Sequence, residues 1–329
     1  MAEERDTLAR RKRLHPVSTG KRVTPNDRDL LWFTKLREHG PLPTSFLLQY
    51  CAHMRGSEKR SRERLTDLFN EDNTPDNGRY LLRPPQQFRT LDSRYNQLVY
   101  DLAPAAERAL ARDGLSSSSS NRHTGPWLHS FMVSCVTASV ELAALARGDI
   151  NYIPQSQILV RAKTELRWPT RFVDPASKRL IEKDLLPDAL FGLEYLTNSG
   201  SRYRFFAVEC DRATEPATTA NFNRKSVLRN LLQHEDYTGG GYRKHLNLTA
   251  PLLVLNIASD PARMRQCIDL TAKHYPSGNA YMLYQVWEDF GVVFRPPEPR
   301  PALLVGDWLR GGLAPFWIDR AQTIPFKCL

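Results

Sequence analysis

A serine-rich run in the first half of the chain constrains the fold most, because it cannot form part of a packed core. Gly114-Leu115 is followed by consecutive serines from Ser116 to Ser120. Segments rich in Gly and Ser behave as flexible linkers. The chain has 329 residues, which exceeds one average domain. We therefore expect two domains, 24–115 and 127–290, joined by a flexible linker over 116–126.

Composition narrows the classes of partner. Hydrophobic residues make up 41% of the chain, so it can bury real cores. The net charge of +10 favours polyanions, with nucleic acid first and an anionic membrane surface second. The membrane alternative is weaker, because no basic amphipathic helix with an aromatic face accompanies the charges. The five cysteines form no C-x-x-C pair and the N-terminus has no secretory signal, so we expect a cytoplasmic protein with reduced thiols.

The first domain has the pattern of a winged helix-turn-helix. We expect helices from Pro25 to Gly40, over 44–52 and over 57–70. Two strands over 79–83 and 96–102 and a helix over 104–111 follow. Three helices, a two-stranded wing and a further helix are the elements of that DNA-binding fold. Residues 1–23 are rich in Arg and Lys and are expected to be a basic disordered arm, which could also track phosphates.

The third helix of this pattern is the predicted recognition helix. Leu65, Leu68 and Phe69 define its buried face, and charged residues point away from it. Arg and Lys side chains read guanine edges and grip phosphates. The alternatives are a solvated basic helix and a winged helix that contacts protein. The candidate DNA-binding residues are Lys59, Arg60, Arg62, Glu63 and Arg64.

The second domain reads as an α/β domain with a mixed sheet. A largely apolar helix is expected over 128–146. The longest apolar run of the chain, 131–146, is interrupted by Glu141 and is too short to span a bilayer. Asn198-Ser199-Gly200 reads as a hairpin turn. Residues 291–329 form a Pro-rich C-terminal extension, either a docked tail or a partner-binding arm. Expected strands cover 157–160, 185–193, 203–211, 252–257 and 281–286, and expected helices cover 222–234 and 261–273.

Carboxylates in this domain are the candidates for catalysis. Glu209 and Asp211 lie two apart on one strand, so they share a face of the sheet, and Asp188 stands on the neighbouring strand. Converging carboxylates bind Mg²⁺ or Mn²⁺, and such an ion activates water and neutralises charge on a phosphodiester. Lys225, expected on the next helix, would stabilise the phosphate charge in transition. Alternatively, these acids pair with the arginines nearby, which are Arg204, Arg212 and Arg224.

Three segments resemble the replication-relaxation proteins of plasmids and integrative elements, with MobC-type mobilisation relaxases as relatives. They are 186–191, 206–215 and Lys225. The segment 29–102 and the helix bearing His129 also fit, so the resemblance spans most of 24–290. It implies a winged helix followed by a restriction-endonuclease-like domain of the PD-(D/E)xK type. Asp211 stands where that pattern has Lys, so Lys225 would be a migrated substitute.

Two functions follow from these patterns. The first is a DNA-processing protein of plasmid or mobile-element replication or mobilisation. It would bind an origin-like site in double-stranded DNA and nick it as a Mg²⁺- or Mn²⁺-dependent relaxase-like enzyme, with replication or mobilisation partners. The second is a non-enzymatic DNA-binding regulator or accessory with an inactive nuclease-like scaffold. The paired-histidine relaxase type is not supported because no His-x-His occurs, although Tyr237 and Tyr242 beside a Gly turn could be nucleophiles.

Overall fold

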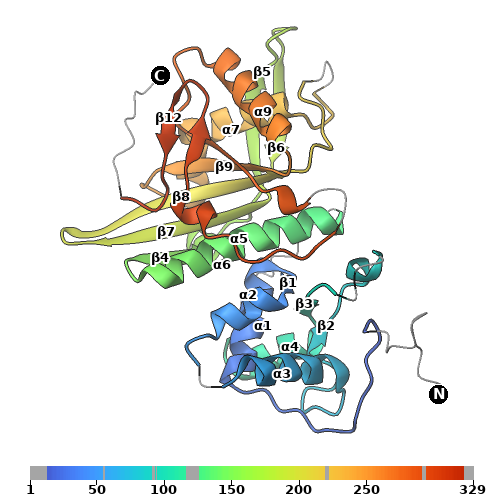
Figure 1. Ribbon diagram of the computed structural model, residues 1–329. Coiled ribbons are helices and arrows are strands. Elements are labelled where there is room, and N and C mark those ends of the chain that lie inside the picture. The colour runs from blue at the N-terminus through green and yellow to red at the C-terminus, as the bar shows by residue number, and fades with distance from the viewer. Residues whose placement is uncertain are drawn as a thin grey trace. The chain divides into compact units, whose positions relative to one another are not determined.

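The computed structural model describes residues 13–54, 56–90, 93, 95–115, 126–218, 222–290 and 294–321 (Figure 1). The chain divides into two compact units. Unit 1 is Met1–Ser120 with Val293–Glu298, and unit 2 is Asn121–Val292 with Pro299–Leu329. Most of the expected linker, and residues 1–12 of the expected arm, lie outside the described residues.

Unit 1 packs helices around a small antiparallel sheet whose described strands run in the order β1-β3-β2. The additional strand β1 pairs with β3 and was not expected. Trp32, Phe33, Phe46 and Tyr80 are buried in its core. The elements are α1 (Asp27–His39), β1 (Leu42–Pro43), α2 (Thr44–Tyr50), α3 (Glu58–Asn70), β2 (Leu81–Leu82), the 3-10 helix η1 (Pro85–Phe88), β3 (Val99–Leu102) and α4 (Pro104–Arg112).

Helix α1 begins at Asp27 and not at Pro25 as predicted. Asn26 caps it, and its side chain accepts a hydrogen bond from the Asp29 amide while the Asp29 carboxylate accepts one from the Asn26 amide. This reciprocal pair satisfies two free amides, which a cap at Thr24 would not do. Helix α3 begins as predicted, with the Ser57 hydroxyl accepting from the Arg60 amide.

A buried ion pair joins α3 to the start of α1. The carboxylate of Asp29 is fully buried, and Arg64 Nη2 lies 2.6 Å from its Oδ2. The same nitrogen donates to the Thr24 carbonyl at 2.6 Å. The guanidinium of Arg64, which was predicted to contact DNA, therefore binds Asp29 and the Thr24 carbonyl within unit 1.

Residues 13–23 do not form a disordered arm. Ser18 and Thr19 donate hydrogen bonds of 2.6 to 2.9 Å to the carboxylate of Glu71, which is buried. Burial would raise the pKa of Glu71, but these hydrogen bonds outweigh it and lower that pKa. Val23 is buried as well, and its amide donates to the Asn73 carbonyl. The buried acid thus holds this segment against the helical body.

Unit 2 is built on a mixed sheet whose described strands run in the order β12-β11-β10-β9-β8-β7-β4. Strands β8, β9 and β10 are parallel, and the other pairs are antiparallel. The mixed α/β architecture is confirmed, as is the hairpin turn between β7 and β8. The strands are β4 (Ile150–Pro154), β7 (Ala189–Thr197), β8 (Gly200–Asp211), β9 (Leu252–Ala258), β10 (Met282–Val286), β11 (Trp308–Arg310) and β12 (Leu313–Phe316).

Helices cover both sides of this sheet. Figure 1 shows α5 (Trp127–Arg147) on one side and α7 (Val227–Asp236) and α9 (Pro261–His274) on the other. Leu231 of α7 and Cys267 of α9 pack with Val254 and Tyr284 of the sheet. Shorter elements are α6 (Gln155–Ala162), the π-helix η2 (Tyr237–Gly241), α8 (Tyr242–Leu246), the 3-10 helix η3 (Glu288–Phe290) and α10 (Ala302–Val305).

Among the described residues, α5 is the helix that is long and apolar enough to cross a membrane, in contrast to the expectation from its sequence. In its most apolar 18-residue window, 83% is buried inside the fold. A core helix that is hydrophobic all round meets the same criterion. The finding therefore carries little weight as a sign of a membrane span.

Two predicted strands of unit 2 are wrong. Residues 157–160 lie inside α6, since a short apolar run does not distinguish a strand from a buried helix. The expected strand 185–193 is two strands, because Pro187 lacks an amide proton and interrupts the ladder. The first of them, β6 (Leu180–Leu185), pairs with β5 (Trp168–Val173) in a separate hairpin.

The segment expected to be a C-terminal extension also differs. Strands β11 and β12 lie within it and extend the large sheet beyond β10. Trp308 and Phe316 are buried there. Residues 299–321 are therefore part of the core of unit 2 and not an appended tail.

Arg64→Ala should destabilise unit 1 by about 3 kcal/mol, because it leaves the buried Asp29 carboxylate without its partner. Arg62→Ala is the matched control, since Arg62 pairs with the exposed Glu58 one turn away, and should cost less than about 0.5 kcal/mol. Native-state hydrogen exchange of the α1 and α3 amides measures both losses. Equal losses in the two variants would contradict this account.

Candidate functional site

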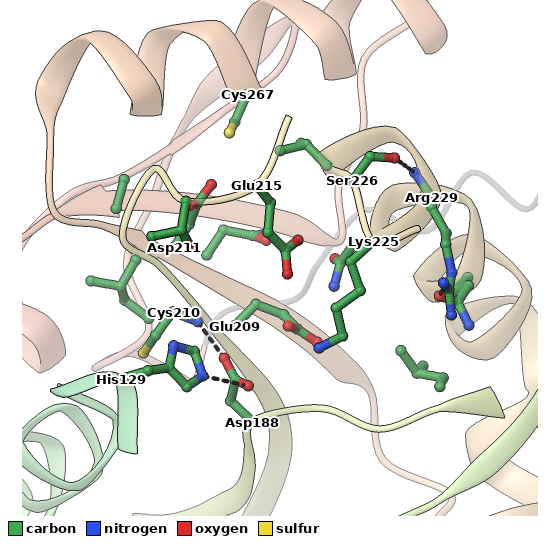
Figure 2. A pocket seen from close by; sticks show the side chains of 18 of the residues that line it. His129, Asp188, Glu209, Cys210, Asp211, Glu215, Lys225, Ser226, Arg229 and Cys267 are labelled. Atoms are coloured by element: carbon green, nitrogen blue, oxygen red, sulfur yellow. Dashed lines mark hydrogen bonds and ion pairs between the residues drawn. The ribbon is translucent and has the colours of Figure 1, made fainter. Parts of the chain in front are cut away.

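One pocket of unit 2 is lined by all four residues predicted to be catalytic. Asp188, Glu209, Asp211 and Lys225 contribute to its wall (Figure 2). They come from the start of β7, the end of β8 and the loop before α7. Strand pairing brings the first two together, because the Asp188 amide donates to the Val208 carbonyl, one residue before Glu209.

Asp188 is held from two directions. Its Oδ2 accepts a hydrogen bond of 2.8 Å from the Cys210 amide of β8. Its Oδ1 lies 2.9 Å from Nε2 of His129, near the start of α5. The hydrogen bond to Asp188 raises the pKa of His129, although burial opposes it. The carboxylate is therefore fixed between the sheet and the helix.

Glu209 is about as exposed as Asp188, with 16% and 15% of the two side chains accessible. Its Oε1 lies 2.7 Å from Nε2 of His234, a fully buried side chain on α7. Burial raises the pKa of Glu209, and the negative charge of Asp188 raises it further, while His234 and Lys225 act in the opposite direction. The two carboxylates therefore interact as like charges in a desolvated site.

Lys225 lies in the loop before α7 and not on a helix as expected. The helix begins at Val227, after Ser226, whose hydroxyl accepts from the Arg229 amide. Figure 2 shows the Lys225 side chain extending toward Glu209. Lys225 therefore still places a cation near the carboxylates, although it does so from a loop and not from the predicted helix.

Asp211 does not join the two other carboxylates. Its Oδ2 lies 2.6 Å from Nε of Arg263 on α9, and its Oδ1 accepts from the Ala213 amide. Arg263 also donates to the Glu215 carbonyl at 2.6 Å. Within the described part of the chain, no three ligand atoms in this pocket meet at metal-binding distances of one another. The alternative that an acid here pairs with an arginine holds for Asp211.

Three further residues complete the surroundings. His129 and His234 were not predicted as site residues, since a histidine on an apolar helix resembles a core residue until its partner is known. Glu215 lines the pocket too. Burial raises the pKa of Glu215, and the nearby charge of Lys225 lowers it. The sequence signal that could have identified Glu215 as a pocket residue was its position, four residues after Asp211.

The two tyrosines beside the glycine turn are buried. Tyr237 and Tyr242 are each 2% exposed. The Tyr237 hydroxyl hydrogen-bonds to Nδ1 of His245 at 2.8 Å, and burial raises the pKa of this tyrosine. Both rings pack in a hydrophobic cluster with Leu246. These contacts are those of core residues and not of accessible nucleophiles.

The predicted recognition helix α3 of unit 1 exposes most of its charged residues. Lys59, Arg60, Arg62 and Glu63 are exposed. Arg62 forms a 2.6 Å ion pair with Glu58 one turn earlier on the helix. A shallow concavity on this face mixes signs, with Lys21, Lys59 and Arg62 beside Glu58, Glu63 and Asp67.

Asp211→Ala should destabilise unit 2 by about 2 kcal/mol, because it removes the carboxylate partner of the buried Arg263 and leaves that charge with the Glu215 carbonyl and the side-chain amide of Gln266. The double variant with Arg263→Met should be less destabilised than the sum of the single variants, since the two share one ion pair. Urea unfolding of the full chain measures the three losses. Additive losses would show that the ion pair is not the reason.

Comparisons with known proteins place the chain in a family. Its sequence matches the family model described as replication-relaxation over residues 33–252, well over half of the chain. No curated protein matches it. Among solved structures it is similar to the SdaI restriction endonuclease, at 12% identity over 83% of this chain and 88% of that chain, with a TM-score of 0.19. That TM-score is too low to support an argument. On the family match, the chain belongs to the replication-relaxation family.

Proposed function

We propose that this chain is a DNA-processing protein of plasmid or mobile-element replication or mobilisation. In this proposal the pocket of unit 2 nicks double-stranded DNA, and unit 1 binds it as a winged helix. Membership of the replication-relaxation family supports the process, and the net charge of +10 supports a polyanionic partner.

The observation that carries the proposal is the meeting of Asp188, Glu209 and Lys225 in one pocket. Burial raises the pKa of Glu209, and the negative charge of Asp188 raises it further. Holding two carboxylates so close in a desolvated site is unfavourable unless cations accompany them. Lys225 supplies one positive charge against two carboxylates, so a second cation would balance the charge of the pair.

The donors suit a hard divalent cation. Mg²⁺ is commonly held by one or two carboxylates together with waters and substrate phosphates. Asp188 and Glu209 would be those two ligands. Asp211 is no longer proposed as a metal ligand, because it pairs with Arg263. When bound, Mg²⁺ or Mn²⁺ would lower the pKa of a water and neutralise phosphate charge.

The surrounding residues would orient this machinery. His129 and the Cys210 amide hold Asp188, and His234 holds Glu209. Such second contacts orient metal-binding carboxylates and tune their basicity. Lys225 would place its ammonium against the phosphodiester and stabilise the charge that grows there during cleavage.

Unit 1 would present α3 to the major groove. Lys59 and Arg60 are the strongest candidates, because both are exposed near the N-terminal end of α3. Arg62 is partly neutralised by Glu58, and Arg64 holds Asp29. We therefore reduce the predicted set of cations to Lys59 and Arg60, with Arg62 in support.

A second candidate function is a DNA-binding accessory whose pocket is an inactive scaffold. It is favoured by the internal hydrogen bonds of the carboxylates, since Asp188, Glu209 and Asp211 each have protein partners already. Under this function the histidines would serve packing alone. The binding of a divalent ion separates the two functions.

The wild type should convert supercoiled plasmid to the nicked form in Mn²⁺ or Mg²⁺ and not in excess chelator. Asp188→Asn and Glu209→Gln should lower the nicking rate at least about 100-fold, since each removes a metal ligand, and should leave DNA affinity unchanged. Asp149→Asn, an exposed acid paired with Arg147, is the control and should nick normally. Absence of wild-type nicking, together with absence of calorimetric Mn²⁺ binding, would leave the scaffold function.

The double variant Lys59→Glu with Arg60→Glu should weaken duplex binding. The loss should be about 1–3 kcal/mol for each specific side chain–base contact that is removed. Glu63→Gln removes an opposite charge from the same face and should not weaken it. Fluorescence anisotropy of the full chain with a labelled duplex, repeated across salt concentrations, measures both. Wild-type affinity and salt dependence in the double variant would exclude α3 as the element that binds DNA.

A further inference from the structure

The β5–β6 hairpin stands beside the pocket and has no role in the proposed function as described above. Asp184 and Leu185, at the end of β6, line the pocket. Gln233 of α7 fixes this end of the hairpin, donating to the Asp184 carbonyl at 3.0 Å and to the Thr170 hydroxyl at 3.1 Å. Figure 1 shows the hairpin extending from this base toward a free turn.

One face of the hairpin anchors it to the rest of unit 2. Phe172 packs with Phe222 and with Leu232 of α7, and the Arg171 amide donates to the carboxylate of Asp236. The contacts fix its direction relative to the pocket. These contacts anchor the hairpin up to Phe172, one residue before Val173, so the part that lies beyond them is the end of the ladder with its turn.

Charge is distributed unevenly along this hairpin. Along the strands, Arg167 pairs with Asp184 at 3.3 Å beside the pocket, and Arg171 pairs with Glu182 at 2.9 Å further toward the turn. At the turn, Lys178 and Arg179 are both exposed. Neither lies within ion-pair distance of a described acid, although the Ser177 hydroxyl and, more weakly, the charge of Lys178 lower the pKa of Asp174. Asp174, the acid of the turn, is buried and accepts hydrogen bonds from the Ala176 amide and the Ser177 hydroxyl. The turn therefore presents two cations to solvent.

An apolar pair stands directly beside these cations. Val173 and Leu180 are cross-strand partners at the end of the ladder, and they are 51% and 63% exposed. Because these two side chains stay largely in water, they stabilise the folded chain little. Two cations beside an exposed aliphatic pair match DNA, in which cations meet phosphates and aliphatic side chains insert at base steps of the minor groove.

We propose that the tip of the β5–β6 hairpin, made of Val173, Lys178, Arg179 and Leu180, is a second binding surface for the double-stranded DNA on which the pocket acts. The inference rests on the proposed function. A strand rises about 3.3 Å per residue, so the five steps of β6 from Leu185 at the pocket to Leu180 place the tip roughly 17 Å from the pocket. That distance corresponds to about five base pairs of B-DNA, since each strand rises 3.4 Å per nucleotide.

A membrane surface fits these residues less well. Binding to anionic lipid usually takes a cluster of about four to eight cations, and the tip has two. The base of the hairpin lies at the pocket itself, so a ligand that reaches both must be long and carry repeated charge. A DNA duplex meets that requirement.

The first test uses salt-titrated anisotropy of the full chain with a mixed-sequence duplex of about 30 base pairs. Lys178→Ala with Arg179→Ala should reduce the slope of log K against log salt by about 1.8, since two cations no longer neutralise phosphates, and weaken binding about tenfold or more at 0.1 M salt. Arg167→Ala with Arg171→Ala removes the same number of cations from the same hairpin. This control should change the slope little, because those arginines are already paired.

The second test does not depend on cleavage. Leu180→Cys, in a Cys328→Ser background, would carry a thiol-reactive photo-crosslinker, since Cys51, Cys135, Cys210 and Cys267 are buried. Crosslinks to the duplex should form from position 180. The same label at Leu196→Cys, an exposed site on β7, should not crosslink.

The outcomes separate the two proposals. Crosslinks from position 180 with a reduced slope support DNA binding by the tip, even if the wild type nicks no DNA. A wild type that nicks, with unchanged slope and no crosslink, overturns DNA binding by the tip and leaves the proposed function standing. A wild type that binds no duplex overturns both, and tip-dependent binding to phosphatidylserine vesicles in its place would identify a membrane partner.

Discussion

The antiparallel pairing of β7 with β8 determines where the two carboxylates of the pocket stand. Ala189 lies opposite Val208 in the register, and the Asp188 amide continues the ladder to the Val208 carbonyl. A slip of one residue would turn Glu209 to the other face of the sheet. The pocket, the histidines that reach it and the hairpin that borders it all depend on this register.

Removing each of the carboxylates near the pocket from water is unfavourable, and each is stabilised by different partners. Asp188 accepts from a backbone amide and from His129, Glu209 meets His234, and Asp211 meets Arg263. The ion pair of Asp211 is complete in itself. The histidine contacts leave Asp188 and Glu209 as neighbouring like charges, which is why the proposed metal centre rests on these two.

The basic residues of α3 in unit 1 have two different roles, since some stabilise the fold and others lie exposed on the surface. Arg64 and Arg62 are two residues apart on α3, yet one holds a buried acid and the other an exposed one. The helical pattern placed both outside the buried face and made both candidates for DNA contact. Their partners, 35 and 4 residues away in the chain, separate their roles.

The sequence by itself indicated the four helices of unit 1 and its strands β2 and β3, though not β1. It also indicated the mixed sheet of unit 2 and the turn before Gly200, because periodicity, caps and turn residues are local signals. It also indicated Asp188, Glu209 and Lys225, through short motifs. Only the tertiary structure decided that Asp211 belongs to Arg263, that 157–160 is helical and that β11 and β12 complete the sheet. It also brought His129 and His234 to the carboxylates. Those outcomes depend on contacts between residues far apart in the chain, which no local pattern encodes.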